Sequence, residues 1–225
     1  MQPAVVVLAR DEARELPRLL DHLAALPGRW EVVLADGGSA DGTPELARGR
    51  GVPVVTEPGG RAAQANAGAR ATTGDPVLFL HADSRLPSTA HAALRRALHD
   101  PEVAGGWFAL RFDGRGWFPR LLGAVYALQQ RAGFSYGDST LWCRRAVFDA
   151  LGGFRELPIM DDYDLARRLA THGRIARIPG PSTTSSRRWE RMGVVRTLLS
   201  WWVIRWLYVA GVEPARLARL YRAVR

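Results

Sequence analysis

The chain has 225 residues and a formal net charge of +9, and all 31 of its cationic side chains are arginine. This length suits one domain with a small appendage, and a composition of 47% hydrophobic and 24% charged residues excludes a disordered chain. The single cysteine, Cys143, excludes an intramolecular disulfide and any metal site built from several cysteines.

The chain shows no secretory signal, because charged residues follow the short apolar run at its start. The nearest candidate for a membrane span, 194–212, contains Arg196 and Arg205, whereas a transmembrane helix needs about 20 mostly apolar residues. We therefore expect a cytoplasmic protein. The tryptophan-rich C-terminal third leaves open a peripheral location on the inner face of the cell membrane.

The first hundred residues alternate between strand and helix patterns. Continuous apolar runs predict four buried strands, at 5–8, 31–35, 53–56 and 77–80. The stretches between them predict three helices, at 16–26, 44–48 and 61–70. This alternation predicts a mostly parallel sheet with right-handed crossovers, and ligands of such sheets bind at the carboxyl ends of the strands.

Beyond residue 87 the pattern changes. It predicts helices at 90–98, 121–131 and 161–171, and an extended segment at 105–112. In the segment 194–208 apolar residues occupy almost every position apart from two arginines, so a helix there has no clean polar face. Such a helix packs on the rest of the chain or against a second copy, or it touches a membrane.

A glycine-rich segment, DGGSADGT at 36–43, follows the second predicted strand. Glycines let backbone N–H groups approach a ligand, and Asp36 could accept a hydrogen bond from a base or a ribose. The alternative is a tight turn with a helix cap. The sequence contains no dinucleotide-binding GxGxxG after the first strand and no phosphate-binding GxxxxGK[ST], so the corresponding site types are disfavoured.

The fourth predicted strand ends in His81-Ala82-Asp83. A carboxylate at this edge could hold a divalent cation that bridges a diphosphate, because hard cations prefer oxygen ligands. The same carboxylate could instead cap the following helix. His81 is expected to orient a neighbour or a ligand rather than to bind the metal.

Arginines and carboxylates supply the remaining candidates. Arg61 begins the helix that carries Asn66, and it could reach a phosphate at the sheet edge or remain a solvated charge. Asp161 and Asp162 begin a later helix, where they either complement the helix dipole or include a general base. Arg187-Arg188-Trp189 could clamp a diphosphate and stack on a sugar or lipid, or it could form a surface loop.

In this order, the motifs resemble those of family 2 glycosyltransferases, and most closely those of a small stand-alone bacterial subgroup. The resemblance runs over nearly the whole chain, from Arg10-Asp11-Glu12 to the closing 214–221. It implies an α/β GT-A fold, in which helices flank a mostly parallel, Rossmann-like sheet. It also implies one catalytic domain over 1–190, with a nucleotide-binding half (1–100) and an acceptor half (101–190), and a C-terminal helical extension over 191–225.

The resemblance also implies roles for individual residues. The donor-binding residues would be Ala9, Arg10, Glu12, Asp36, Gly38, Arg61, Asn66, His81, Ala82, Asp83 and Arg188. The acceptor-binding residues would be Gly137, Asp138, Trp142 and Trp189. Asp162 would be the catalytic base beside Asp161, and Asp83 would hold Mg²⁺ or Mn²⁺.

Several positions depart from the family pattern. His81 replaces the first acid of the D-x-D motif, so Asp83 is its one direct carboxylate ligand. Asp11 replaces an Asn, Asp161 replaces a Glu, and Ser139 and Ser185 stand where Gln is usual. The expected reaction is a single in-line displacement with inversion, in which a sugar moves from a UDP- or GDP-sugar to an acceptor hydroxyl.

Two other classes of protein remain as alternatives: a nucleotidyltransferase-like enzyme, and a non-catalytic protein that binds a nucleotide or a membrane surface. The expected partners are a nucleotide-sugar donor, an acceptor that is lipid-linked in one version of the hypothesis, a membrane surface and a second copy in a homodimer. Nucleic acid is not expected, because acidic residues lie where a phosphate backbone would have to lie.

Overall fold

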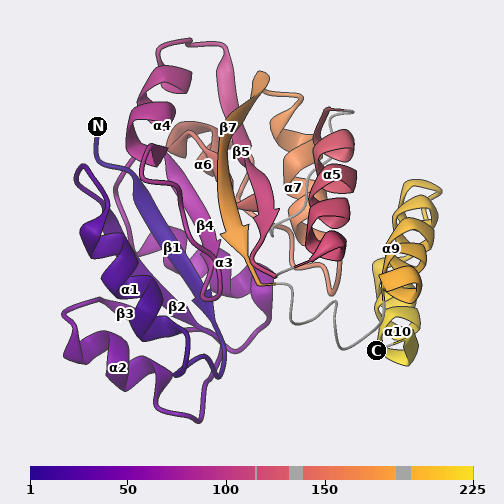
Figure 1. Cartoon of the computed structure of the whole chain (residues 1–225), viewed down its shortest axis with the longest axis horizontal. Helices are drawn as coiled ribbons and strands as arrows, with labels where there is room; N and C mark the ends of the chain where they lie inside the picture. The colour runs from indigo at the N-terminus through magenta and orange to yellow at the C-terminus, as the bar shows by residue number, and fades with distance from the viewer. Residues whose placement is uncertain (115, 132–138, 186–193, 225) are drawn as a thin grey trace.

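The computed structural model describes residues 1–114, 116–131, 139–185 and 194–224 (Figure 1). Within these residues, seven strands form one sheet in the order β3-β2-β1-β4-β6-β5-β7. The strands are β1 (Ala4–Ala9), β2 (Glu31–Asp36), β3 (Val54–Thr56), β4 (Val77–His81), β5 (Val103–Phe112), β6 (Leu141–Cys143) and β7 (Arg174–Thr184). The four strands predicted from the first hundred residues are all present, each within two residues of its predicted ends.

The sheet is parallel except at one strand. β1 pairs in parallel with β2 and β4, β2 with β3, and β5 with β7, whereas β6 is antiparallel to its neighbours β4 and β5. This arrangement confirms the mostly parallel sheet. The carboxyl ends of β1, β2 and β4 therefore meet at a single edge, which is where ligands of such sheets bind.

Helices cover both faces of this sheet, as Figure 1 shows. One face packs against α1 (Leu16–Ala25), α2 (Thr43–Gly49) and α4 (Ala90–Leu98), and the other packs against α3 (Arg61–Arg70), α6 (Arg145–Ala150) and α7 (Asp161–Leu169). Val5 and Val7 of β1 point into the first core, and Ala4 and Val6 point into the second. Burial on both faces explains why this strand is a continuous apolar run.

Three helices form a third cluster beside the sheet: α5 (Trp117–Arg131), α9 (Val194–Val209) and α10 (Pro214–Val224). Figure 1 shows α9 and α10 side by side at one end of the molecule. Ile204 of α9 and Leu217 of α10 are buried in the same cluster as Leu122 of α5 and Tyr163 of α7. One face of the C-terminal segment thus packs on the rest of the chain. Among the described residues, none of the helices combines the length and the apolarity that crossing a bilayer requires.

The sequence patterns miss β6 and β7, and they start α5 four residues late. β7 contains Pro179, Gly180 and Pro181, residues that disfavour a strand interior, but it lies at the sheet edge, where proline is tolerated. Proline is also tolerated in the first turn of a helix, which is where Pro119 lies in α5.

Candidate active site

Three strands bring several predicted site residues to the carboxyl edge of the sheet. Ala9 at the end of β1 lies opposite Asp36 at the end of β2, and Leu8 of β1 lies opposite His81 at the end of β4. The backbone N–H of Ala82 donates to the carbonyl of Leu8 at 3.2 Å. Strand register alone therefore juxtaposes four residues predicted to bind the donor: Ala9, Asp36, His81 and Ala82.

Asp36 shapes the glycine-rich loop that follows it. Its carboxylate is buried and accepts hydrogen bonds from the N–H groups of Gly38 (3.0 Å) and Ser39 (3.1 Å). It also accepts one from the Ser39 hydroxyl at 2.5 Å. Because Asp36 accepts three hydrogen bonds from its own loop, its first effect is to hold that loop in one conformation. Contact between Asp36 and a nucleobase stays a prediction.

The loops after β1 and β2 are tied together by side-chain to backbone hydrogen bonds. The N–H of Asp11 donates to Ser39 Oγ at 2.9 Å, and Asp11 Oδ1 accepts from the N–H of Ala40 at 2.9 Å. Glu12 N–H donates to Thr43 Oγ1 at 2.9 Å. The exposed side chain of Arg10 precedes this junction. The segment 36–43 can therefore be both a tight turn and a ligand-binding loop, because these bonds hold it rigid at the carboxyl edge of the sheet.

A neighbouring carboxylate in this junction has a lowered pKa. The Thr43 hydroxyl donates to Asp41 at 2.5 Å, and this bond is the largest cause of the decrease in the pKa of the Asp41 carboxyl. The backbone N–H groups of Ala13 and Thr43 add to it. Asp41 is therefore a charged anchor between the two loops across the neutral pH range.

Two amide side chains of α3 fix the backbone around the site. Gln64, which the sequence patterns did not assign to the site, is buried and donates to the carbonyls of Ala9 (2.8 Å) and Ala35 (2.5 Å). Asn66, predicted to bind the donor, pairs with the backbone of Phe154: it donates to the carbonyl at 2.8 Å and accepts from the N–H at 2.8 Å. Asn66 thus ties α3 to the turn that follows α6, and its contact with the donor stays a prediction.

The acid pair lies at the N-terminus of α7 and meets Arg61 at the N-terminus of α3. Arg61 Nε donates to Asp161 Oδ2 at 3.0 Å, and its Nη2 donates to Asp161 Oδ1, which makes a bidentate pair. Arg61 Nη2 lies 3.5 Å from Asp162 Oδ2, and Asp162 Oδ1 accepts from the N–H of Tyr163 at 2.7 Å. Both carboxylates are buried, so Arg61 and the helix N-terminus offset a large desolvation cost.

A small cavity joins the acid pair to the strand edge. Arg61, His81, Asp161 and Asp162 line it together, with Phe154 and other apolar side chains. Met160, the residue before the acid pair, has a φ of 66°, which is uncommon for a residue other than glycine. The structure thus brings predicted donor-binding and catalytic residues into one lining, and a strained backbone precedes the two acids.

Asp83 follows β4 and is partly exposed. Among the described residues, no group of three or more His, Cys, Asp or Glu side chains could by itself hold a metal ion. This donor set fits Mg²⁺ or Mn²⁺ delivered with a diphosphate, because such ions are commonly held by one or two carboxylates and by substrate phosphates. It does not fit a metal that needs a complete set of protein ligands.

One further predicted residue that the structure describes, Trp142, does not line this cavity. Trp142 of β6 is fully buried in the core with Leu78 and Phe108, so the prediction that it contacts an acceptor is not supported by its position. Its burial follows from its place in a central strand between β4 and β5. Four other predicted residues lie outside the residues that the structure describes: Gly137, Asp138, Arg188 and Trp189.

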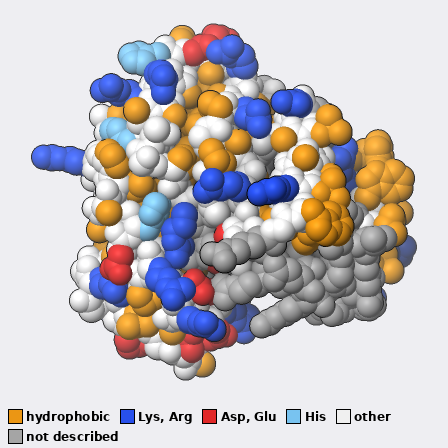
Figure 2. Space-filling view, viewed as in Figure 1, with side chains coloured by type: hydrophobic (Ala, Val, Ile, Leu, Met, Phe, Trp, Pro, Cys, Tyr) orange, Lys and Arg blue, Asp and Glu red, His pale blue; other side chains and the backbone are white. Residues whose placement is uncertain are grey.

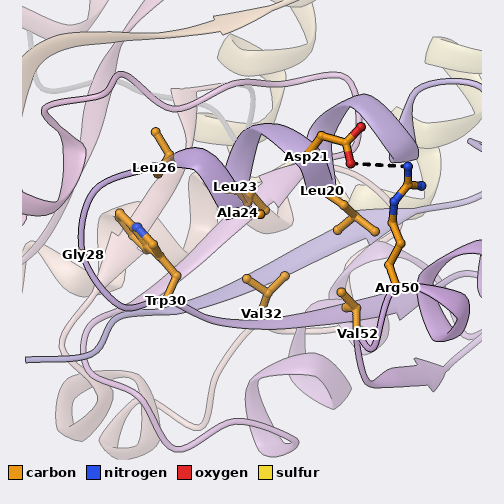
Figure 3. Close-up of a pocket in the computed structure, with 10 residues that line it drawn as sticks. All are labelled: Leu20, Asp21, Leu23, Ala24, Leu26, Gly28, Trp30, Val32, Arg50 and Val52. Carbon is orange, nitrogen blue, oxygen red and sulfur yellow. Dashed lines mark ion pairs between the residues drawn. The ribbon is translucent and has the colours of Figure 1, made fainter.

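Charge around the carboxyl edge is mixed. Figure 2 shows arginine side chains around this part of the surface, with acidic side chains between them. A much larger hollow, a groove of about 450 Å³, lies elsewhere, against α1 and β2. Figure 3 shows its mainly apolar lining, with Trp30 at one end and an Asp21–Arg50 ion pair (3.3 Å) at the other. Of the predicted site residues that the structure describes, none lines this groove, so we place the candidate site at the strand edge.

The mostly parallel seven-stranded sheet with helices on both faces is the GT-A fold of glycosyltransferases. A mannosyltransferase from Pyrobaculum calidifontis, solved with GDP-Man and Mn²⁺, matches 81% of this chain and 56% of its own, with a TM-score of 0.66 and 25% identity. S. aureus TarS, solved with UDP-GlcNAc, has the same fold: it matches 82% of this chain and 58% of its own, with a TM-score of 0.68 and 19% identity.

Residues 4–154 match the family described as Glycosyl transferase family 2, and the chain belongs to that family. Among curated relatives, the beta-monoglucosyldiacylglycerol synthase of Synechocystis is 29% identical over 76% of this chain and 40% of its own length. The succinoglycan biosynthesis protein ExoA of Rhizobium meliloti is 33% identical over 51% of this chain and 28% of its own. The chain thus spans less than half the length of these two relatives.

Proposed function

We propose that the protein transfers a sugar from a nucleoside diphosphate to an acceptor hydroxyl, with inversion of configuration and with help from a divalent cation. Membership of the family supports the reaction class. The observation that carries the proposal is the contact of Arg61, from the predicted donor half, with Asp161 and Asp162, from the predicted acceptor half. This contact supports the proposal because Asp162, which we propose as the base, lies 3.5 Å from a guanidinium group that can also meet a diphosphate.

The two acids differ in how Arg61 engages them, and this difference supports Asp162 as the base. Both oxygens of Asp161 accept hydrogen bonds from Arg61, whereas Asp162 Oδ2 lies 3.5 Å from Arg61 Nη2. Asp161 is thus committed to orienting Arg61. In our proposal Asp162 removes the proton of the acceptor hydroxyl, whose oxygen attacks the anomeric carbon while the diphosphate leaves. One base is enough, since no covalent intermediate forms.

Charge that develops on the leaving diphosphate needs stabilisation. The guanidinium of Arg61 has five N–H donors, so it can hold Asp161 and also meet a phosphate oxygen. Asp83 would hold Mg²⁺ or Mn²⁺, and such an ion supplies Lewis-acid stabilisation of the diphosphate. The P. calidifontis mannosyltransferase was solved in complex with GDP-Man and Mn²⁺, and this complex supports both the donor class and the cation.

The acceptor in our proposal is a hydroxyl group of a lipid-linked molecule. The Synechocystis relative is named for a glucosylated diacylglycerol, which is a product of this kind. The S. aureus neighbour, in contrast, shares only the fold and adds nothing about the acceptor. The domain division at residue 190, with a helical extension after it, remains part of the same hypothesis.

A product assay tests the proposal directly. The protein would be incubated with UDP- and GDP-sugars, Mn²⁺ and a lipid extract, and the products identified by mass spectrometry. We expect a nucleoside diphosphate and a glycosylated lipid. Release of a sugar 1-phosphate, with transfer of the nucleotidyl group, would instead indicate a nucleotidyltransferase, and binding of nucleotide without turnover would indicate a binding protein. Asp83→Asn should abolish the activation of turnover by Mn²⁺ while the protein stays folded. Activation by Mn²⁺ equal to that of the parent protein would contradict the role of Asp83.

A further inference from the structure

Helix α9 is mostly apolar, and the other residues that the structure describes pack against one of its sides. Its inner side includes Ile204 and Tyr208, which pack with α5, α7 and α10. Its outer side exposes five large hydrophobic residues, each 44% to 60% exposed: Leu199, Trp202, Val203, Trp206 and Val209. Helices that are hydrophobic all round are normally buried on every side, so this outer side calls for a partner.

The five residues form one stripe, here called the outer stripe of α9. Their spacing of three or four residues places them on one face, over a length of about 15 Å. The rings of Trp202 and Trp206 are in contact, with centroids 6.2 Å apart, and the Arg205 guanidinium lies 5.4 Å from the Trp206 ring centroid. Figure 2 shows hydrophobic side chains at this end of the molecule. The two tryptophans of the stripe thus form one continuous aromatic surface.

Charge identifies the partner. Segments 117–131 and 194–225 contain eight arginines and one acidic residue, Glu213. On α10, which packs beside α9, Arg216 and Arg219 are exposed. In a symmetric pair these arginine-rich helices would meet their own copies, and like charges would repel. Anionic lipid headgroups, in contrast, are complementary to arginine, and tryptophan favours the headgroup layer.

We propose that the outer stripe of α9 binds the surface of an anionic lipid bilayer. Trp202 and Trp206 enter the headgroup layer, and arginines of the neighbouring α10 meet the anionic headgroups. On the inner side of α9, the Tyr208 hydroxyl donates to Asp164 at 3.4 Å, and its ring contacts that of Tyr163. Docking therefore brings α7, the helix of the acid pair, close to the bilayer. That docking gives access to a lipid-linked acceptor rests on the proposed function. The docking itself does not depend on that function.

Vesicle co-sedimentation tests this proposal. The probes are vesicles of phosphatidylcholine alone and of phosphatidylcholine mixed with phosphatidylglycerol. We expect binding to the mixed vesicles, loss of binding at high salt, and binding weakened by roughly tenfold or more in the Trp202→Ala/Trp206→Ala double variant. Leu46→Ala, at a partly exposed leucine of α2, is the control and should bind like the parent protein. Both substitutions lie on the surface, so melting temperatures should stay close to that of the parent.

Three results would overturn the proposal: no binding to the mixed vesicles, equal binding by the double variant, or equal binding to both kinds of vesicle. A dimer in solution that the double variant dissociates, without any lipid affinity, would show that a second copy covers the stripe. Nucleotide binding measured without vesicles keeps this test separate from the proposed function. Binding of lipid without binding of nucleotide would support the docking surface and would contradict the proposed transferase function.

Discussion

Arg61 on α3 and Asp161 on α7 are 100 residues apart in the chain and form a bidentate ion pair. The pair joins the N-terminal ends of two helices that pack on the same face of the sheet. It also distinguishes the two acids, because both oxygens of Asp161 accept hydrogen bonds from Arg61, whereas Asp162 Oδ2 lies 3.5 Å from Arg61 Nη2 and Asp162 Oδ1 accepts from the N–H of Tyr163. The chemistry of the site and the stability of the fold are therefore coupled through one guanidinium.

Substitution of Arg61 by Gln should destabilise the protein by about 2 kcal/mol. The change leaves two buried carboxylates without their cation, and the value lies below that of a fully buried pair because the Arg61 side chain is 39% exposed. Urea unfolding followed by circular dichroism measures the change. Arg155→Gln is the control, since Arg155 is mostly exposed and its pair with Asp164 should contribute less than about 1 kcal/mol. Equal effects of the two substitutions would contradict this account.

Substitution by asparagine should have different effects at Asp161 and Asp162. Asp162→Asn should lower turnover about 100-fold or more, the usual scale for loss of a general base, while the melting temperature and donor affinity change little. Asp161→Asn should lower the melting temperature and reduce turnover less, because it weakens the pair with Arg61. Steady-state kinetics and thermal unfolding of both variants check this. A larger loss of turnover for Asp161→Asn would indicate that Asp161, and not Asp162, is the base.

Ser39→Ala should weaken nucleotide binding without unfolding the protein. The hydroxyl of Ser39 donates to Asp36 and accepts from the N–H of Asp11, so it joins the loops after β1 and β2. Its loss should raise the Kd for a nucleoside diphosphate by roughly five- to tenfold, the equivalent of one hydrogen bond. Isothermal titration calorimetry measures this Kd. Ser88→Ala, in an exposed turn, is the matched control, and an effect of equal size there would contradict a specific role of Ser39.

The N-terminal half of the fold was predictable because its signals are local. Val5 to Leu8 is apolar whatever surrounds it, and the segment after Asp36 contains its own turn residues. β7 was not predictable, because its prolines are compatible with a strand only at a sheet edge, which is a property of the whole sheet. The need for glycine at position 106 of β5 was not predictable either, because it arises from the contact with β7: a Cβ on Gly106 would lie 1.8 Å from the carbonyl oxygen of Ala176.

The candidate site also combines features that local sequence predicts with features that depend on the whole fold. The motifs identify residue types, and strand register then places Asp36 and His81 on one edge. Partners that are distant in sequence leave no local signal, so the pairing of Asn66 with the backbone of Phe154 and the pairing of Arg61 with Asp161 came from the structure. In both cases a residue expected to face the donor also fixes part of the protein, and its substitution will affect binding and stability together.

Cys143 provides a probe of how firmly β6 is held between β4 and β5. Its thiol is fully buried, and desolvation raises its pKa well above the ordinary value of 9.0. A Cβ on Gly105 of β5 would lie 2.9 Å from Cys143 Cβ, which shows how closely the strands approach. Because the thiolate is the reactive form, we expect negligible labelling by a thiol reagent in native buffer and complete labelling in denaturant. Rapid labelling of the native protein would show that the centre of the sheet opens.

The raised pKa of Cys143 also predicts a loss of stability in alkali. The folded state keeps the thiol protonated, so the contribution is fully present below pH 9.0, the value for an unperturbed thiol. Above that pH the unfolded state ionises and the folded state does not, so stability falls by about 1.4 kcal/mol per pH unit from this group alone. Tyrosines also ionise there, and the comparison with Cys143→Ala removes their share. Urea unfolding at pH 8 and pH 10 should show a smaller alkaline loss for the variant; equal losses would place the thiol in contact with water.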